Sequence, residues 1–341
     1  MKKTSLNDIA QRLGVSKTLV SMVLNGKGKE HRISDEVCKK VEQVAKELNY
    51  RPNQLAKGLR TGKTNTIGLI IADIANPFFG KLGREIEREA ARKGYRVIFS
   101  SSDESAEKSQ QQIEMLMQGQ VDGFIISPPM YSEEQILNLA RDKKPYVLID
   151  RYFPEIDSNY IIIDNQEAAY DATMHLVDKE LKRIAFITIN ADLVNMNDRL
   201  IGYKKALLDS GLPIDEALIK VLPFSHESKD VHNAIKQLIR KDKKGTDAIL
   251  FATSKVGIMG IESLISLGIN IPDDLAIVSF DDPDAYKICY SPVTVMAQPL
   301  TEIGKMAVQV LLSEIKNPKS SIKTQKITLK TNFVIRKSCG S

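Results

Sequence analysis

Four side chains near the start of the chain have the types and the spacing to meet the edges of DNA bases in a groove. A helix over residues 17–25 turns these four outward, because apolar side chains such as Val20 and Val23 occupy its other face. The four outward side chains are Lys17, Thr18, Ser21 and Met22. For this chemistry to work, neighbouring elements must hold the helix against the duplex.

The preceding residues predict such a support. Residues 6–13 place Leu6, Ile9 and Leu13 on one helical stripe. Gly14 tolerates the left-handed turn that ends this helix, and Ser16 is a good N-cap for the next one. Two short helices around a glycine turn are typical of the helix-turn-helix, whose second helix lies in the major groove of DNA.

The distribution of charge agrees with a polyanionic partner. The chain has 341 residues and a net charge of +5. Residues 1–65 hold 14 Lys and Arg against 6 Asp and Glu, a net of +8, whereas the remaining residues hold 34 against 37, a net of −3. Basic N-termini are often only solvated, but here the helix-turn-helix pattern accompanies the charge. The charge therefore favours binding to nucleic acid.

A third helix and a connector follow. Ser34 can cap an amphipathic helix. Pro52 then disfavours helix at the residue before it, and Asn53 can cap a new segment. That segment, residues 54–60 (QLAKGLR), is short and contains a glycine, so a helix there should be marginal in isolation. Residues 61–66 form a polar linker.

After residue 66 the sequence changes character. Short apolar runs alternate with amphipathic stretches, which is typical of parallel sheets covered on both faces. We expect strands near residues 67–72, 97–99, 124–126, 146–149, 160–163, 184–189, 218–222, 247–251 and 276–280. We expect helices near residues 79–93, 106–118, 133–142, 166–179, 196–210, 229–241 and 256–267. These two series predict two doubly wound α/β lobes with ligand-binding loops at the carboxyl ends of their strands. The last elements, near residues 293–296, 301–316 and 325–335, would return the chain to both lobes and form a hinged cleft.

Cysteine use and hydropathy indicate a reducing compartment. Cys38, Cys289 and Cys339 are odd in number and widely spaced, which argues against a disulfide scaffold or a zinc site. The first residues turn polar before an apolar signal sequence forms, and the longest apolar runs are too short to cross a bilayer. We expect a cytoplasmic protein that needs no metal and no cofactor.

Eight motifs follow one another along nearly the whole chain. They are LNDIAQRLGVSKTLVSMVLNG, VEQVAKELNYRPNQLAKGLRTGKTNTIGLI, ADIANPFFGKLGREIEREAARKGY, VLIDR, DNQEAAYDATMHL, DRLIGYKKAL, IPDDLAIVSFDD and SPVTVMAQPLTEIG. In this order they resemble the lactose/galactose-repressor family of bacterial transcription regulators. The resemblance implies a homodimer whose two heads read a pseudo-palindromic operator. It also implies a core like a periplasmic binding protein, which holds a small effector, usually a sugar or a related metabolite.

The expected domain boundaries follow from the pattern and the resemblance together. Residues 1–52 form the helix-turn-helix domain, residues 53–66 form a hinge helix and linker, and residues 67–338 form the effector-binding and dimerisation core. Within the core we assign residues 67–164 and 294–324 to the N-lobe. Residues 165–293 and 325–338 are assigned to the C-lobe.

In this family the first two positions of the recognition helix read base edges, which assigns that role to Lys17 and Thr18. Lys17 would donate to guanine O6 and N7, and Thr18 would contact a base edge or a thymine methyl group. Met22 stands where the family often has an arginine, so operator preference would differ. Three serines lie at or near helix starts, where they suit phosphate contacts, helix capping or both. They are Ser5, Ser16 and Ser34.

The connector matches the family's hinge helix at Asn53, Ala56 and Leu59. This helix folds only on the operator and inserts a leucine into the central minor-groove step, a role that falls to Leu59. Gly58 should weaken such a helix by about 1 kcal/mol relative to alanine. The alternative is an ordinary linker whose Leu55 and Leu59 pack on the head.

The resemblance also assigns nine side chains to an effector site between the lobes. They are Phe78, Phe79, Ser127, Asp150, Asn195, Arg199, Phe224, Ser254 and Asp281. Carboxylate acceptors, one guanidinium group and aromatic faces suit a polyhydroxylated ligand. Arg199, Asp150 and Asp281 are favoured, since a buried charge at a strand end is costly without a partner. Core packing explains a residue such as Phe79 equally well, and Ser254-Lys255 replaces an Asn-Asp pair that is frequent in the family.

The remaining polar residues are less informative. Asp281 and Asp282 are adjacent and point apart on a strand, and no histidine has the spacing of a metal ligand beside them. The four histidines are scattered, and we expect them on surfaces or helix faces. They are His31, His175, His226 and His232. The tail after Phe333 lacks the leucine heptads of a tetramerising coil, so a dimer is expected.

Three classes of function compete, and the residues favour one. We expect a repressor of carbohydrate-catabolism genes that a small sugar-like effector releases from its operator. A corepressor-activated, purine-type repressor and an activator use the same architecture and stay open. A sugar-binding transport protein is a more distant alternative, because the helix-turn-helix opposes it. An enzyme is not expected, because no P-loop, GxGxxG or GxSxG element stands at a strand–helix junction.

Overall fold

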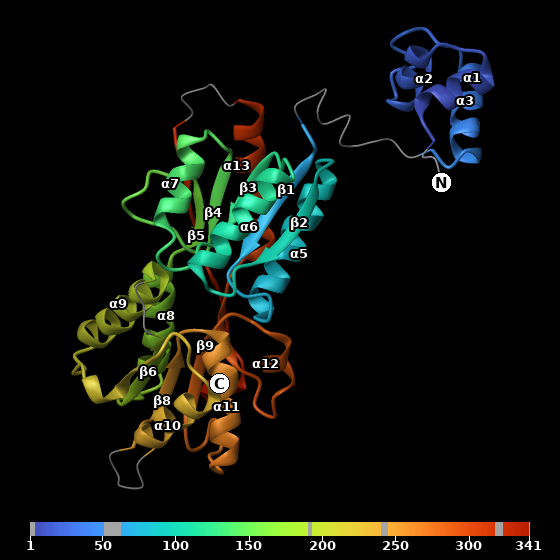
Figure 1. Ribbon diagram of the computed structural model, residues 1–341. Coiled ribbons are helices and arrows are strands. Elements are labelled where there is room, and N and C mark those ends of the chain that lie inside the picture. Colours follow the sequence, from blue (N-terminus) through green and yellow to red (C-terminus); the bar gives the residue numbers. More distant parts are fainter. Residues whose placement is uncertain (1–3, 51–62, 190–192, 240–244, 318–322, 341) are drawn as a thin grey trace. The chain divides into compact units, whose positions relative to one another are not determined.

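The computed structural model describes residues 4–50, 63–189, 193–239, 245–317 and 323–340. The chain divides into two compact units, Met1–Thr64 and Asn65–Ser341. Figure 1 draws both units, and each has its own apolar core. We call the first unit the head and the second unit the core domain.

Residues 4–50, the part of the head before the gap in the described chain, contain three helices. These helices are α1 (Leu6–Leu13), α2 (Lys17–Leu24) and α3 (Asp35–Glu47). Gly14 ends α1 with a φ of 64°, a left-handed conformation that costs glycine little. The three helices contact one another around a small core in which Ile9, Val20 and Val41 are fully buried. This arrangement confirms the predicted helix-turn-helix and the third helix beside it.

The first lobe of the core domain is a six-stranded parallel sheet with the order β11-β5-β4-β3-β1-β2. Its strands are β1 (Thr66–Ile71), β2 (Arg96–Ser101), β3 (Gly123–Ile126), β4 (Tyr146–Ile149), β5 (Tyr160–Ile163) and β11 (Lys326–Leu329). Its helices are α5 (Pro77–Arg92), α6 (Ala106–Gln118), α7 (Glu133–Arg141) and α13 (Leu300–Lys316). Leu69 belongs to the apolar cluster that includes α5 and α13, whereas its neighbour Ile70 belongs to the cluster that includes α6 and α7. Successive side chains of a strand point to opposite faces, so helices on both faces bury the whole strand.

The second lobe repeats this plan with the order β12-β10-β9-β8-β6-β7, in which only the pairing of β10 with β12 is antiparallel. Its strands are β6 (Ile184–Ile189), β7 (Ile219–Leu222), β8 (Ala248–Phe251), β9 (Ala276–Phe280), β10 (Thr294–Ala297) and β12 (Asn332–Val334). Its helices are α8 (Asn165–Asp178), α9 (Val194–Asp209), α10 (Ser228–Leu238), α11 (Ser254–Ser266) and α12 (Asp284–Ile288), with short 3-10 turns at Glu216–Leu218 and Lys337–Cys339. Two doubly wound lobes are therefore present, as predicted.

The predicted assignment of two strands to lobes is wrong. We assigned residues 294–324 to the N-lobe, but β10 pairs with β9 in the second sheet. We assigned residues 325–338 to the C-lobe, but β11 pairs with β5 in the first sheet. Both strands have only four residues, and their apolar patterns do not show which sheet receives them. The strands expected over residues 325–335 are present as β11 and β12, and residues 330–331 separate these two strands, which lie in different lobes.

The two lobes face each other through the carboxyl ends of their strands. Asp73 follows β1 and lies 3.6 Å from the Lys255 ammonium group, which follows β8. Asp150 directly follows β4 and Asp281 directly follows β9, with φ angles of 66° and 64°. The same left-handed backbone at equivalent strand ends turns both carboxylates into the junction between the lobes, where open α/β sheets bind their ligands.

Candidate DNA-reading helix and interlobe site

The predicted base-reading face lies on α2. Lys17 and Thr18 are exposed, and Ser21 and Met22 are half-buried. The Ser16 side chain caps this helix by accepting a hydrogen bond from the backbone N–H of Leu19 at 3.1 Å. The helix therefore presents a polar N-terminal turn, which is the part of a recognition helix that enters the major groove.

The three serines proposed for phosphate contacts all act as helix caps in this structure. The Ser5 side chain accepts from the Asp8 N–H, and the Ser5 backbone N–H donates to the Asp8 carboxylate at 2.7 Å, which completes a capping box. Ser34 accepts from the Val37 N–H at 3.4 Å. All three side chains are exposed, so capping leaves room for a phosphate contact, and that second role stays a prediction. The hinge residues Asn53, Ala56 and Leu59 lie outside the described residues.

Arg199 is the central residue of the interlobe site. It belongs to α9 and is only 2% exposed. Its Nε donates to the Asn165 side-chain oxygen at 2.8 Å, its Nη1 donates to the Ala252 carbonyl, and its guanidinium carbon lies 3.9 Å above the Phe280 ring. Burial lowers the pKa of the guanidinium group, while the charges of Asp281 and Asp150 raise it. Arg199 is thus a cation held in place by the second lobe, and both carboxylates lie close enough to stabilise its charge.

Asp281 is well supplied with hydrogen-bond donors. One carboxylate oxygen accepts from Ser254 at 3.3 Å, and the other accepts from Gln298 at 2.9 Å. Burial raises its pKa, and Arg199 opposes that shift. A small cavity of about 40 Å³ lies beside it, lined among others by Phe78 and Ser254.

Asp150 has a different environment. Burial raises the pKa of its carboxyl group to about 6, the charges of Arg151 and Arg199 oppose the shift, and those of Asp281 and Glu104 add to it. Arg151 lies 3.5 Å from the Asp150 carboxylate, but its two terminal nitrogens are engaged with Glu104 at 2.6 and 2.7 Å. Asp150 therefore has a counter-ion that is shared with a competing carboxylate, and burial favours its protonated form.

Eight buried side-chain polar atoms have no hydrogen-bond partner in the described part of the core domain, and three of the eight belong to predicted site residues or to a histidine. These three are Ser127 Oγ, Asn195 Oδ1 and His226 Nε2. Ser127 and Asn195 follow or lie near strand ends at the junction, and were predicted there. His226 was expected on a surface or a helix face, which is wrong, because this residue lies between β7 and α10 and is only 8% exposed. Buried groups without partners cost free energy, so these atoms mark places where a polar ligand gains by binding.

The aromatic candidates divide into lining and packing residues. Phe78 lines the small cavity beside Asp281. Phe79 is 3% exposed and belongs to the apolar core, with its ring 4.9 Å from that of Phe78 in an edge-on arrangement. Phe224 is half-buried and packs against the same core. Phe78 is therefore the phenylalanine with direct access to the site.

The sequence interpretation missed Asn165 and Phe280, which contact Arg199, and it also missed Arg151 and Gln298. Arg151 was part of the motif VLIDR, and its position directly after a predicted site residue was the available signal. Gln298 lies in the crossover after β10, which no periodic pattern marks. Across the described ranges, no group of three or more His, Cys, Asp and Glu side chains has the geometry of a metal site. None of the described helices combines the length and apolar character that a membrane crossing requires.

A helix-turn-helix head followed by a two-lobed core with a charged interlobe site defines a DNA-binding regulator with a ligand-binding domain. Models of two families match the chain: "Bacterial regulatory proteins, lacI family" over residues 5–53, and "Periplasmic binding protein-like domain" over residues 173–339. The HTH-type transcriptional regulator DegA of Bacillus subtilis (strain 168) is 33% identical over 339 residues, which cover 98% of each chain. The chain therefore belongs to the lacI family of bacterial regulatory proteins, whose members are transcription regulators and not enzymes.

Solved structures show the same fold. The transcriptional regulator CelR–cellobiose complex is 25% identical and has a TM-score of 0.72 over 98% of this chain and 100% of that one. The lac repressor dimer bound to operator and the anti-inducer ONPF is 22% identical, with a TM-score of 0.85 and full coverage of both chains. The second likeness concerns the fold alone.

Proposed function

We propose that this regulator represses carbohydrate-catabolism genes and that a sugar-like effector, bound between its lobes, releases it from its operator. The observation that carries the proposal is the buried Arg199, whose charge interacts with two carboxylates at the strand ends of opposite lobes. A fixed guanidinium donor and two carboxylate acceptors match the alternating donors and acceptors of sugar hydroxyl groups.

Support also comes from the position of these groups. Asp150 belongs to the first lobe, whereas Arg199 and Asp281 belong to the second. A ligand that contacts all three must favour one relative placement of the lobes, so its binding energy can shift a conformational equilibrium. A coupling of about 1–3 kcal/mol changes operator occupancy about five- to 150-fold. The CelR structure, which contains cellobiose, is consistent with a sugar as effector.

We further propose that two copies of the chain read a pseudo-palindromic operator, with Lys17 and Thr18 at base edges. Asn53, Ala56 and Leu59 are assigned to the hinge by their sequence alone. Replacing Leu59 by alanine should abolish selective operator binding and spare the salt-dependent binding to unrelated DNA. Selective binding that survives this substitution would reject the assignment of Leu59 as a minor-groove wedge.

The experiment that tests the function begins with DNA fragments selected from the host genome by the purified full-length protein. A thermal-shift screen of sugars and purines identifies the effector class, and fluorescence anisotropy then measures operator binding with and without each stabilising compound. We expect a sugar to stabilise the protein and to weaken operator binding at least about fivefold. A compound that tightens operator binding would instead identify a corepressor, and a stabilising purine without any stabilising sugar would reject the sugar.

A further inference from the structure

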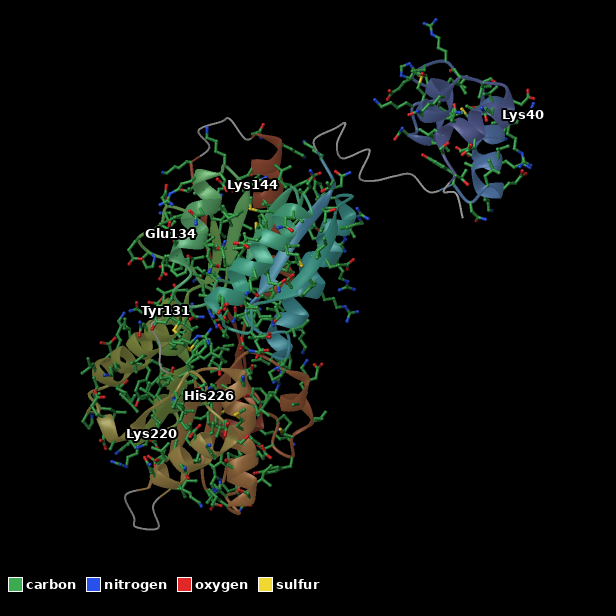
Figure 2. All side chains as sticks on the ribbon, in the orientation of Figure 1. Lys40, Tyr131, Glu134, Lys144, Lys220 and His226 are labelled. Atoms are coloured by element: carbon green, nitrogen blue, oxygen red, sulfur yellow. The ribbon has the colours of Figure 1, made fainter. Side chains whose placement is uncertain are left out.

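A second cavity lies at the junction of the lobes. Its volume is about 260 Å³, which is large beside the roughly 30 Å³ that one water molecule occupies. Tyr131, Tyr152 and Phe153 line it from the first lobe, and Val194 and Asn197 line it from the second. Figure 2 shows the labelled Tyr131 where the two lobes of the core domain meet.

Aromatic rings form one side of this cavity. The Tyr152 ring stacks on Tyr160, with ring centroids 4.3 Å apart, so its position is supported from behind. Tyr131 is 71% exposed and has a φ of 61°. That left-handed conformation is unusual for a bulky residue, and such strain tends to persist where it serves binding. The exposed Tyr131 ring can therefore stack against the apolar face of a ligand.

The cavity lies next to Asp150, one of the carboxylates of the site around Arg199. Arg151 lines the cavity and also lies 3.5 Å from the Asp150 carboxylate. Pro128 and Val194 line it as well, and they directly adjoin Ser127 and Asn195, whose buried side-chain oxygens have no partner among the described residues. Arg151 therefore borders both the aromatic cavity and Asp150, so a molecule bound at Asp150 would lie beside the cavity.

The charges around the cavity favour an uncharged occupant. Glu133 and Glu155 line it, and the guanidinium group of Arg151 is engaged with Glu104. An anionic group such as a phosphate would meet these two carboxylates, and Glu104 already holds both terminal nitrogens of Arg151, the one cationic side chain in the described lining. A neutral sugar ring would place its apolar face on the aromatic rings and donate its hydroxyl groups to the carboxylates.

We propose that the effector is an uncharged disaccharide, with one ring at Asp150, Arg199 and Asp281 and the second ring stacked in the cavity of Tyr131, Tyr152 and Phe153. This inference rests on the proposed sugar-responsive function and names its ligand class. The second ring is selected by the aromatic cavity, which makes Tyr131 and Phe153 specificity-determining residues.

The test uses paired sugars and the full-length protein. Calorimetric titrations compare glucose with cellobiose and maltose, galactose with lactose, and fructose with sucrose. The variants are Tyr131→Ala and Phe153→Ala, and Tyr290→Ala is the matched control, since Tyr290 is a 60% exposed tyrosine that does not line the cavity. Thermal unfolding checks that each variant is folded. The exposed Tyr131 variant decides the question if the half-buried Phe153 variant is unstable.

We expect one disaccharide to bind about tenfold or more tightly than its own monosaccharide. Tyr131→Ala should remove most of this preference, leave the monosaccharide Kd within about twofold, and differ from the control variant. A monosaccharide that binds as tightly as its disaccharides, with both cavity variants behaving like Tyr290→Ala, would overturn the inference and leave the sugar-responsive function standing. Failure of every sugar to bind would overturn the proposed function itself, and this inference with it.

Discussion

The candidate contact residues of the head and those of the interlobe site differ in their exposure to water. Lys17 and Thr18 are exposed on a helix whose cap is complete without DNA. Arg199, Asp150 and Asp281 are at most 9% exposed, and the last two have pKa values raised by burial. An exposed basic surface gains affinity for DNA by releasing counterions. A small-molecule site instead buries charged side chains, and each buried charge without a partner destabilises the folded protein.

This difference leads to a general expectation. Substitutions of exposed base-contacting residues in the head should change DNA affinity and leave stability nearly unchanged. Substitutions in the interlobe site should change stability and ligand binding together. Four predictions test it, each with its own control.

The largest effect is expected from Arg199→Met. Without the Arg199 cation, the buried carboxylates of Asp150 and Asp281 lose a positive charge that stabilises them. The free energy of unfolding should therefore fall by about 3–5 kcal/mol. Effector binding should weaken about 100-fold or more, while operator binding without effector stays within a few fold. Urea unfolding, calorimetry and anisotropy measure the three quantities. Arg141→Met is the control, because Arg141 is a surface residue with a 64% exposed side chain. Normal effector release in the Arg199 variant would show that the site lies elsewhere.

Asp150→Asn should have a smaller effect on the free energy of unfolding, and at pH 7 it should raise that free energy instead of lowering it. The folded-state pKa of Asp150 is raised to about 6 from 3.8 by burial, so the folded protein holds this proton more tightly than the unfolded chain does. That contribution to stability is complete below pH 4 and is lost as the pH rises through 6. The neutral asparagine avoids the loss, and should stabilise the protein by up to about 3 kcal/mol at pH 7 and by almost nothing at pH 4.

Urea unfolding from pH 4 to pH 7 checks this pH dependence. Asp284→Asn is the control, since Lys81 and Lys287 lower the pKa of the exposed Asp284 carboxyl group. The control should therefore show no gain at pH 7. A variant at position 150 that is less stable than the wild type at pH 7 would mean that the carboxylate charge supports the fold.

In the head, Lys17→Ala should lose about 1–3 kcal/mol of binding to the selected operator and change the unfolding free energy by less than about 0.5 kcal/mol. The loss should depend on the base sequence at one position of each half-site. Lys40→Ala on α3, whose side chain is 61% exposed and pairs with Glu36, is the comparison. Equal losses in both variants, or a loss that ignores base sequence, would place Lys17 at the phosphates instead of the bases.

The smallest expected effect concerns Ser34. Two variants distinguish a role in helix capping from a role in contacting a DNA phosphate. Ser34→Ala should cost the head about 1 kcal/mol, because the Val37 N–H loses its acceptor. Ser34→Asp keeps a capping oxygen and adds a negative charge. If Ser34 contacts a phosphate, the Asp variant should be as stable as the wild type and bind DNA less tightly. Unchanged DNA binding in that variant would leave Ser34 as a cap only.

Much of the fold was predictable because its signals are local. The apolar stripe over residues 6–13 and the caps at Ser16 and Ser34 predicted the helices of the head closely. The lobe assignment of β10 and β11 failed because pairing partners are set by contacts between residues far apart in the sequence, which four-residue strands do not reveal.

The site was predictable to a similar extent. Asp150 and Asp281 directly follow strong apolar strands, so their place at the junction could be expected. The pairing of Arg151 with Glu104 joins residues 47 positions apart, and no sequence spacing indicates it. Tyr131 and Phe153 lie in loops without periodicity, so the aromatic cavity emerges only from the three-dimensional structure.

The most direct test of the account is the affinity of the effector measured twice, with and without saturating operator DNA. Coupled sites must affect each other equally, so the effector Kd should rise in the presence of operator by the same factor by which the effector weakens operator binding. We predict a rise of about five- to 150-fold in the full-length protein. An effector Kd that is identical with and without operator would contradict the claim that the interlobe site controls DNA binding.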